Sequence, residues 1–96
     1  MSIKIILNFE KSLMGLAGYQ FGIKTYQEQV KNKIQFDDEI VIVFPENIQR
    51  IASSFIQGFF EDVVKEIGIS GIEERVSIIS SKKNMKESII SNLLWG

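Results

Sequence analysis

The chain has 96 residues and a net charge of −1 at pH 7; hydrophobic residues make up 45% of it and charged residues 24%. This balance predicts one folded domain over residues 1–96 and disfavours disorder and nucleic-acid binding, which requires a basic surface. Histidine and cysteine are absent, which excludes Ser-His and Cys-His catalysis and disulfide bonds. No apolar run approaches the ~20 residues that span a bilayer, so a cytoplasmic protein without membrane contact is expected.

The first predicted element is a strand over residues 2–9, where apolar and polar residues alternate. Its apolar face holds Ile3, Ile5, Leu7 and Phe9. Glycines are dense in the next segment, residues 10–22, which argues against one regular helix. Two alternatives stand there: a hairpin with a short second strand, or a mobile loop. The order "GLAGYQFG" lacks the Gly-Lys-Ser/Thr of a phosphate-binding loop, so an enzyme using this segment is the weakest functional class.

A helix is predicted over residues 25–34, because Thr25 and Glu28 have the spacing of a capping box; it could also begin earlier, near Gln20. One stripe of it is apolar at helical spacing and holds Ile23, Tyr26, Val30 and Ile34. The turn that follows is acidic. Its residues are Asp37, Asp38 and Glu39. They are predicted to be solvated, since a cation site would need oxygen ligands from several loops.

Residues 39–44, "EIVIVF", are continuous and β-branched, which predicts a central strand covered on both faces and ended by Pro45. The strongest periodic signal follows in residues 55–67, where apolar side chains recur every three or four positions. This predicts a helix that begins at the adjacent serines 53 and 54 and ends with Gly68 as its C-cap.

The last two elements are a strand over residues 75–80 and a helix with Asn84 as its N-cap. The apolar face of that helix holds Met85, Ile89, Ile90, Leu93 and Leu94. Trp95 either folds back on the core or stays exposed as an interaction anchor. Alternating strands and helices predict an α/β domain with a small, mostly parallel sheet of about four strands and right-handed crossovers.

Ser53 and Ser54 raise the main functional question of the sequence. Ser54 with Gln57 has capping-box spacing, and an N-cap is worth ~1 kcal/mol, so one serine is accounted for by stability. The other interpretation is phosphorylation, because a phosphate at a helix start meets free backbone N–H groups and adds charge that a partner can read. Local physics favours the cap.

The strand–turn–helix segment resembles the STAS domain family, and more specifically STAS-like domains of unknown function. The matching pieces are the strand 40–44, "SSF" at 53–55, the acidic pair 61–62 and "EIG" at 66–68. The resemblance covers roughly residues 20–94. In anti-sigma-factor antagonists of that family, an Asp-Ser-Ser-Gly-Leu pattern opens the helix and a kinase-like anti-sigma factor phosphorylates a serine. Ser53 and Ser54 match the pattern, whereas Ala52 and Phe55 depart from it.

The missing histidine, cysteine and phosphate motif predict a protein without enzymatic activity, cofactor or metal, and the resemblance implies a regulatory protein-binding module. Its partner would be a histidine-kinase-type ATPase or another regulatory protein, bound by occlusion at Ser53, Ser54 and Gln57 and switched by serine phosphorylation. The start of the last helix holds a small cluster of Lys82, Lys83 and Lys86. Such a cluster is typical of a solvated face, and the alternative is a second docking patch for an acidic partner. The alternative function is a phage or mobile-element inhibitor that blocks a host defence protein, as anti-CRISPR proteins do. The sequence leaves the oligomeric state open.

Overall fold

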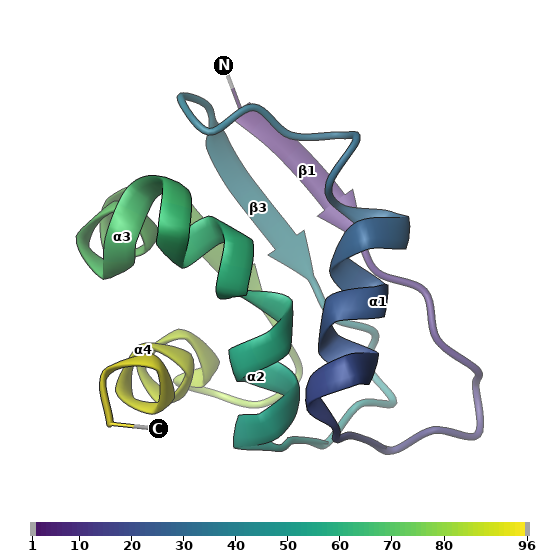
Figure 1. The fold of residues 1–96 in the computed structure, drawn as a ribbon. Coiled ribbons are helices and arrows are strands. Elements are labelled where there is room, and N and C mark those ends of the chain that lie inside the picture. Colours follow the sequence, from purple (N-terminus) through teal and green to yellow (C-terminus); the bar gives the residue numbers. More distant parts are fainter. Residues whose placement is uncertain (1, 96) are drawn as a thin grey trace.

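The computed structural model describes residues 2–95, which form an α/β fold (Figure 1). In chain order the elements are β1 (Ser2–Ile6), β2 (Gly15–Leu16), α1 (Tyr19–Gln29), β3 (Glu39–Val43), β4 (Arg50–Ile51), α2 (Ser53–Phe59), α3 (Glu61–Arg75), β5 (Val76–Ile79) and α4 (Met85–Trp95). None of the helices in this part of the chain combines the length and the apolar character that crossing a membrane requires.

The main sheet has three parallel strands in the order β1-β3-β5, so the strand predicted from "EIVIVF" is central as expected. The predicted parallel sheet is confirmed. Its four expected strands become three, because β2 and β4 form a separate parallel pair. Of the two alternatives left open for residues 10–22, the short second strand is present as β2, but it pairs in parallel with β4 and does not form a hairpin. A two-residue strand is too short to leave a periodic signal.

The chain moves across the sheet in one direction, from β1 through β3 to β5. Right-handed crossovers in one direction place all connecting helices on the same face. Figure 1 accordingly shows the helices in front of the strands. The residues on the helix-covered face are buried or half-buried: Ile3, Ile5, Ile40, Ile42, Val76 and Ile78.

The opposite face of the sheet, which we call the open face, is not covered. Ile6 is 59% exposed and Ile79 is 49% exposed, and the central-strand residues Val41 and Val43 are half-buried. The expectation that the central strand is covered on both faces is therefore wrong. The reason is topological, because no crossover in residues 2–95 returns a helix to that side.

Phenylalanine rings fill the core between the helices and the sheet. Phe59 is fully buried and contacts four other rings, with centroid separations from 4.9 Å to Phe60 to 6.3 Å to Phe44. Phe60 and Val63 are also buried, as the helical periodicity predicts, while Ile67 is half-buried. Ring pairs at these distances add to the hydrophobic contribution of the buried area.

Two glycines allow α1 and α2 to pack backbone to backbone. A Cβ atom on Gly22 would lie 2.3 Å from the Phe55 carbonyl oxygen, and one on Gly58 would lie 2.1 Å from the Tyr19 carbonyl oxygen. Both distances are below any real Cβ contact, so only glycine fits at either position. Gly22, which the sequence pattern indicated as unfavourable for a helix, is thus required inside α1 for close packing against α2.

The start of α1 differs from the prediction of a helix over residues 25–34. The helix begins at Tyr19, close to the earlier start that the sequence left open, and ends at Gln29. Thr25 is not a cap, since its hydroxyl donates to the Phe21 carbonyl oxygen one turn earlier (2.8 Å). Gly18 precedes the helix with a φ of 107°, a conformation that suits glycine.

The predicted helix over residues 53–67 is divided in two. α2 ends at Phe59, because the next residue, Phe60, leaves helical geometry with a ψ of 3°, and α3 begins at Glu61. Gly68 interrupts α3 with a φ of 69° and a ψ of 173°, so the predicted break is confirmed there, but a further helical segment continues to Arg75. The strand predicted over residues 75–80 is present as β5.

The last helix, α4, begins after Asn84, the residue predicted as its N-cap. The Asn84 carbonyl oxygen accepts the Ser88 N–H (3.1 Å), as the carbonyl of an N-cap residue does. Met85 and Ile89 face the core. Trp95 is 86% exposed, which settles the two alternatives in favour of the exposed side chain.

Candidate functional site

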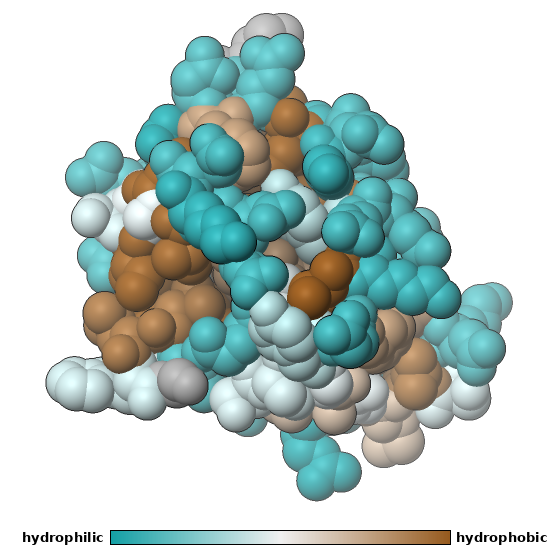
Figure 2. All heavy atoms as spheres, in the orientation of Figure 1, coloured by the Kyte–Doolittle hydropathy of each residue, from teal (hydrophilic) through white to brown (hydrophobic). Residues whose placement is uncertain are grey.

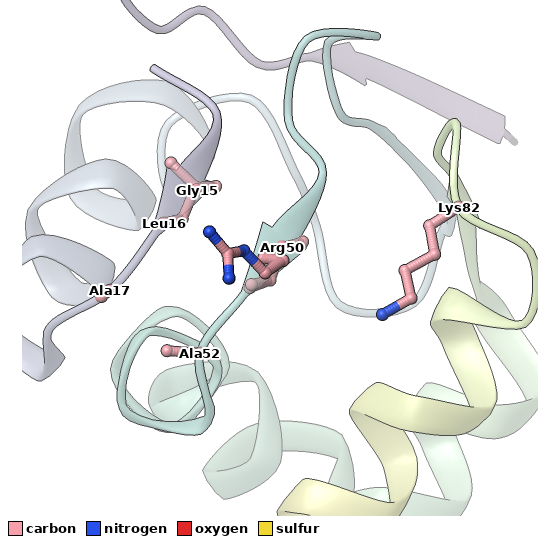
Figure 3. A pocket seen from close by; sticks show the side chains of 7 residues that line it. Gly15, Leu16, Ala17, Arg50, Ala52 and Lys82 are labelled. Atoms are coloured by element: carbon pink, nitrogen blue, oxygen red, sulfur yellow. The ribbon is translucent and has the colours of Figure 1, made fainter.

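A hollow of about 600 Å³ lies beside the β2–β4 pair and the start of α2, and is here called the basic hollow (Figure 3). Its lining is small or apolar except for two cationic side chains: Gly15, Leu16, Ala17, Arg50, Ile51, Ala52 and Lys82. Figure 3 shows the Arg50 guanidinium extending toward Gly15 and Leu16, while Lys82 reaches back toward β4 from the loop after β5. Ligands of α/β proteins commonly bind near the carboxyl ends of strands, where such loops meet.

Backbone hydrogen bonds between distant segments hold the walls of the basic hollow in place. Gly15 pairs with Arg50 and Leu16 with Ile51 in the two-residue ladder. The ladder is extended at both ends, because Gln49 N–H donates to the Met14 carbonyl (2.7 Å) and Ala52 N–H donates to the Leu16 carbonyl (2.8 Å). Asn47 Nδ2 also donates to the Leu13 carbonyl (2.7 Å). The segments around residues 14 and 50 therefore form one scaffold.

The two cations of the basic hollow have no acidic partner within residues 2–95. Neither the Arg50 nor the Lys82 side chain forms an ion pair or hydrogen bond there, and both residues are exposed. Other cations are used differently, since Arg75 donates to the Phe36 carbonyl (2.6 Å) and Lys86 to the Glu73 carbonyl (2.8 Å). The basic hollow thus has uncompensated positive charge in a chain whose net charge is −1.

The two serines differ in their contacts, and the prediction that one of them caps the helix is wrong. Ala52 occupies the N-cap position of α2 without a side-chain hydrogen bond. The Ser54 hydroxyl instead accepts the N–H of Gly18 (2.9 Å), so it ties the start of α2 to the start of α1. Ser53 is exposed in the first turn, next to the wall residue Ala52. The close packing of α1 on α2 makes Gly18 N–H the available donor for Ser54.

Gln57 is not part of a capping box either. Its side-chain amide donates to the Asn92 carbonyl (2.7 Å), which links α2 to α4. Of the predicted lysine patch, Lys82 lines the basic hollow and a neighbouring hollow of about 440 Å³, which Lys83 and Lys86 also line. The structure thus brings Ser53 and Lys82 to the same end of the molecule and uses Gln57 within the fold.

Sequence reasoning missed Arg50 and the glycine-rich wall of the site. Arg50 stands three residues before the serines, but its role depends on the short ladder with Gly15. A strand of two residues has no recognisable period, so only charge next to the serine pair could have drawn attention to it.

Two further titratable groups lie on the flank of α2. The Tyr19 hydroxyl donates to the Glu61 carboxylate, and this hydrogen bond is the main cause that raises the pKa of Tyr19 above its ordinary value. Burial raises the pKa of Tyr26, with smaller contributions from Asp62 and Glu66. Both phenols are therefore neutral at physiological pH. Within residues 2–95, no three acidic side chains gather into a metal-binding group.

No family model, curated protein or solved structure matches this chain. The STAS-like resemblance and the partner-binding roles of the serines and lysines therefore stay predictions.

Proposed function

We propose that this chain is a non-enzymatic, cytoplasmic protein-binding module that captures an acidic surface of a regulatory protein at the basic hollow. The observation that carries the proposal is the pair of cations, Arg50 and Lys82, that line the basic hollow without an acidic partner in residues 2–95. Charges of this kind steer association and select partners of opposite sign.

The lining also supports binding over catalysis. Beside the two cations, the walls offer backbone and the side chains of leucine, isoleucine and alanine, and none of these acts as a general base at neutral pH. An arginine guanidinium and a lysine ammonium suit the recognition of carboxylates, the former in a bidentate manner.

The STAS-like resemblance supplies the kind of partner and its regulation. The partner class is a histidine-kinase-type ATPase or a related regulator, whose surface the module occludes. Both serines are exposed, and Ser53 is the better phosphoacceptor because the Ser54 hydroxyl already accepts the Gly18 N–H. Phosphate on Ser53 would add about two negative charges next to the basic hollow and oppose an acidic partner.

The test compares capture of partners by the wild type and by charge variants. Immobilised wild-type chain is incubated with extract of the source organism, and bound proteins are quantified by mass spectrometry. We expect the wild type to retain at least one protein, and to retain less of it at high salt. The double variant Arg50→Glu with Lys82→Glu should not retain that protein. Lys24→Glu, an exposed position on α1, is the matched control and should retain it.

A partner bound equally by the double variant would contradict the proposal, provided that circular dichroism shows the variant to be folded. A saturable catalytic turnover of nucleotides, phosphoesters or acyl esters that a single substitution abolishes would contradict the non-enzymatic part.

A further inference from the structure

The open face of the main sheet carries a second, separate surface. Parallel sheets are nearly always covered on both faces, because their strands are apolar on both sides. Here the register aligns Ile6, Val43 and Ile79 in one row across the three strands. Ile6 and Ile79 are 59% and 49% exposed, so the outer members of this apolar row face solvent within residues 2–95.

We infer that the open face binds the open face of a second copy of this chain, around a two-fold axis parallel to β3. The row is symmetric about the central strand, with isoleucine on each side of Val43. Rotation about that axis places Ile6 of one copy opposite Ile79 of the other and Val43 opposite Val43. An isologous interface needs this property, in which a surface is complementary to itself.

The charges of the open face fit the same arrangement. Lys4 lies on β1 next to Val41, and Glu39 lies on β3 next to Ser2, so both project on the side of the apolar row. Across the two-fold axis, Lys4 on β1 of one copy lies diagonally opposite Glu39 on β3 of the other copy, offset sideways by the spacing of one strand. The face therefore has no net charge and meets its own copy with opposite charges near each other.

The area of the face sets the strength of the dimer. Strands of five, five and four residues cover only ~220 Å² at ordinary strand spacing and rise. A stable interface buries about 800 Å² on each partner, so the dimer is weak and forms at high protein concentration.

Sedimentation equilibrium tests the inference on the full chain, from about 10 μM to about 1 mM. We expect the average mass to rise toward twice the monomer mass. Ile6→Lys and Ile79→Lys should each weaken the association at least tenfold, because the interface would bury an ammonium group opposite an apolar side chain. The fold is kept, since both side chains are largely exposed in the single chain. Leu94→Lys is the matched control, because Leu94 is 55% exposed on α4, on the helical side.

Cross-linking tests the two-fold axis directly, and the absence of native cysteine removes background. Val43→Cys should give a covalent dimer with a short bismaleimide, whereas Ser91→Cys, exposed on α4, should not. A monomer at about 1 mM, which would leave the face to a different partner, overturns the inference. The inference is also overturned if Leu94→Lys disrupts the association and Ile79→Lys does not. Equal cross-linking of the Val43→Cys and Ser91→Cys variants overturns it as well. Arg50→Glu with Lys82→Glu should leave the dimer unchanged, which separates this result from the proposed function.

Discussion

Ser53 and Ser54 are neighbours in the chain, yet their hydroxyl groups have different surroundings. Both side chains are exposed, but the Ser54 hydroxyl accepts a hydrogen bond from Gly18, a residue 36 positions away in the chain. Adjacent residues of a helix point about 100° apart, so Ser54 can reach the start of α1 while Ser53 in the same turn points elsewhere. The structural role and the recognition role are thereby divided between two residues.

Substitution of Ser54 by alanine should lower the free energy of unfolding by about 1 kcal/mol, because the Gly18 N–H loses its acceptor. Ser53→Ala should change it by less than about 0.5 kcal/mol. Chemical denaturation of both variants measures the difference. An equal loss of stability in both variants would show that the hydrogen bond to Ser54 does not contribute. In a separate measurement, Ser53→Asp should weaken partner capture without loss of stability.

The two tyrosines predict a loss of stability in alkaline solution. The pKa of Tyr26 is raised in the folded state, chiefly by burial, so the folded protein releases this proton later than the unfolded chain does. The resulting stability is present below the unfolded pKa of about 10 and is lost as the pH rises through the folded pKa. We expect Tyr26→Phe to lose less stability than the wild type above that pH, measured by denaturation.

An ultraviolet titration provides the matching control. Tyrosinate absorbance of the folded wild type should appear only above the pH at which the unfolded chain titrates, because the pKa of Tyr19 is raised as well. Absorbance that appears earlier than in the unfolded chain would contradict both assignments.

At the scale of elements, the pairing of α1 with α2 organises the molecule. The pair brings Gly18 to Ser54 and sets the position of the serine-bearing turn beside the basic hollow. Its close approach depends on Gly22 and Gly58, which leave no space for a side chain. The site is therefore sensitive to residues that lie outside it.

Gly58→Ala should cost about 3 kcal/mol, at the upper end for overpacking, because the new Cβ would meet the Tyr19 backbone and not a flexible side chain. Gly15→Ala is the control: the nearest atom to its Cβ would be 3.6 Å away, an ordinary contact. Thermal and chemical denaturation of the two variants compares them. Equal stability would mean that the helices separate without cost.

The whole molecule is a two-layer arrangement with helices on one face of a parallel sheet and an open face on the other. The helical side also carries apolar surface, which Figure 2 shows in brown over α3 and α4. Leu94 and Trp95 are the most exposed apolar residues there, at 55% and 86%. The aromatic core around Phe59 lies between the helical side and the open face.

Phe59→Ala should lower the free energy of unfolding by about 3–5 kcal/mol, because the side chain is fully buried and its removal leaves a cavity among four rings. Leu94→Ala should have a much smaller effect, since that side chain is largely exposed. Urea denaturation measures both. A change within error at Phe59 would show that the core repacks around the loss.

Local patterns in the chain are enough to predict the alternation of strands and helices, the central position of "EIVIVF" and the burial of Phe59, Phe60 and Val63. These features follow from periodicity, which acts over a few residues and is visible in one chain. The break at Gly68 belongs with them, since glycine marks a φ that other residues avoid.

The contacts that join distant segments depend on how the whole chain folds and leave no local pattern. The β2–β4 ladder, the bond from Gly18 to Ser54 and the location of Arg50 at the basic hollow all span more than 30 residues. The open face likewise depends on strand order and crossover hand, which no local pattern records. A capping-box spacing at Ser54 and Thr25 could not foresee this, because a hydroxyl binds whichever partner the packing of helices brings to it.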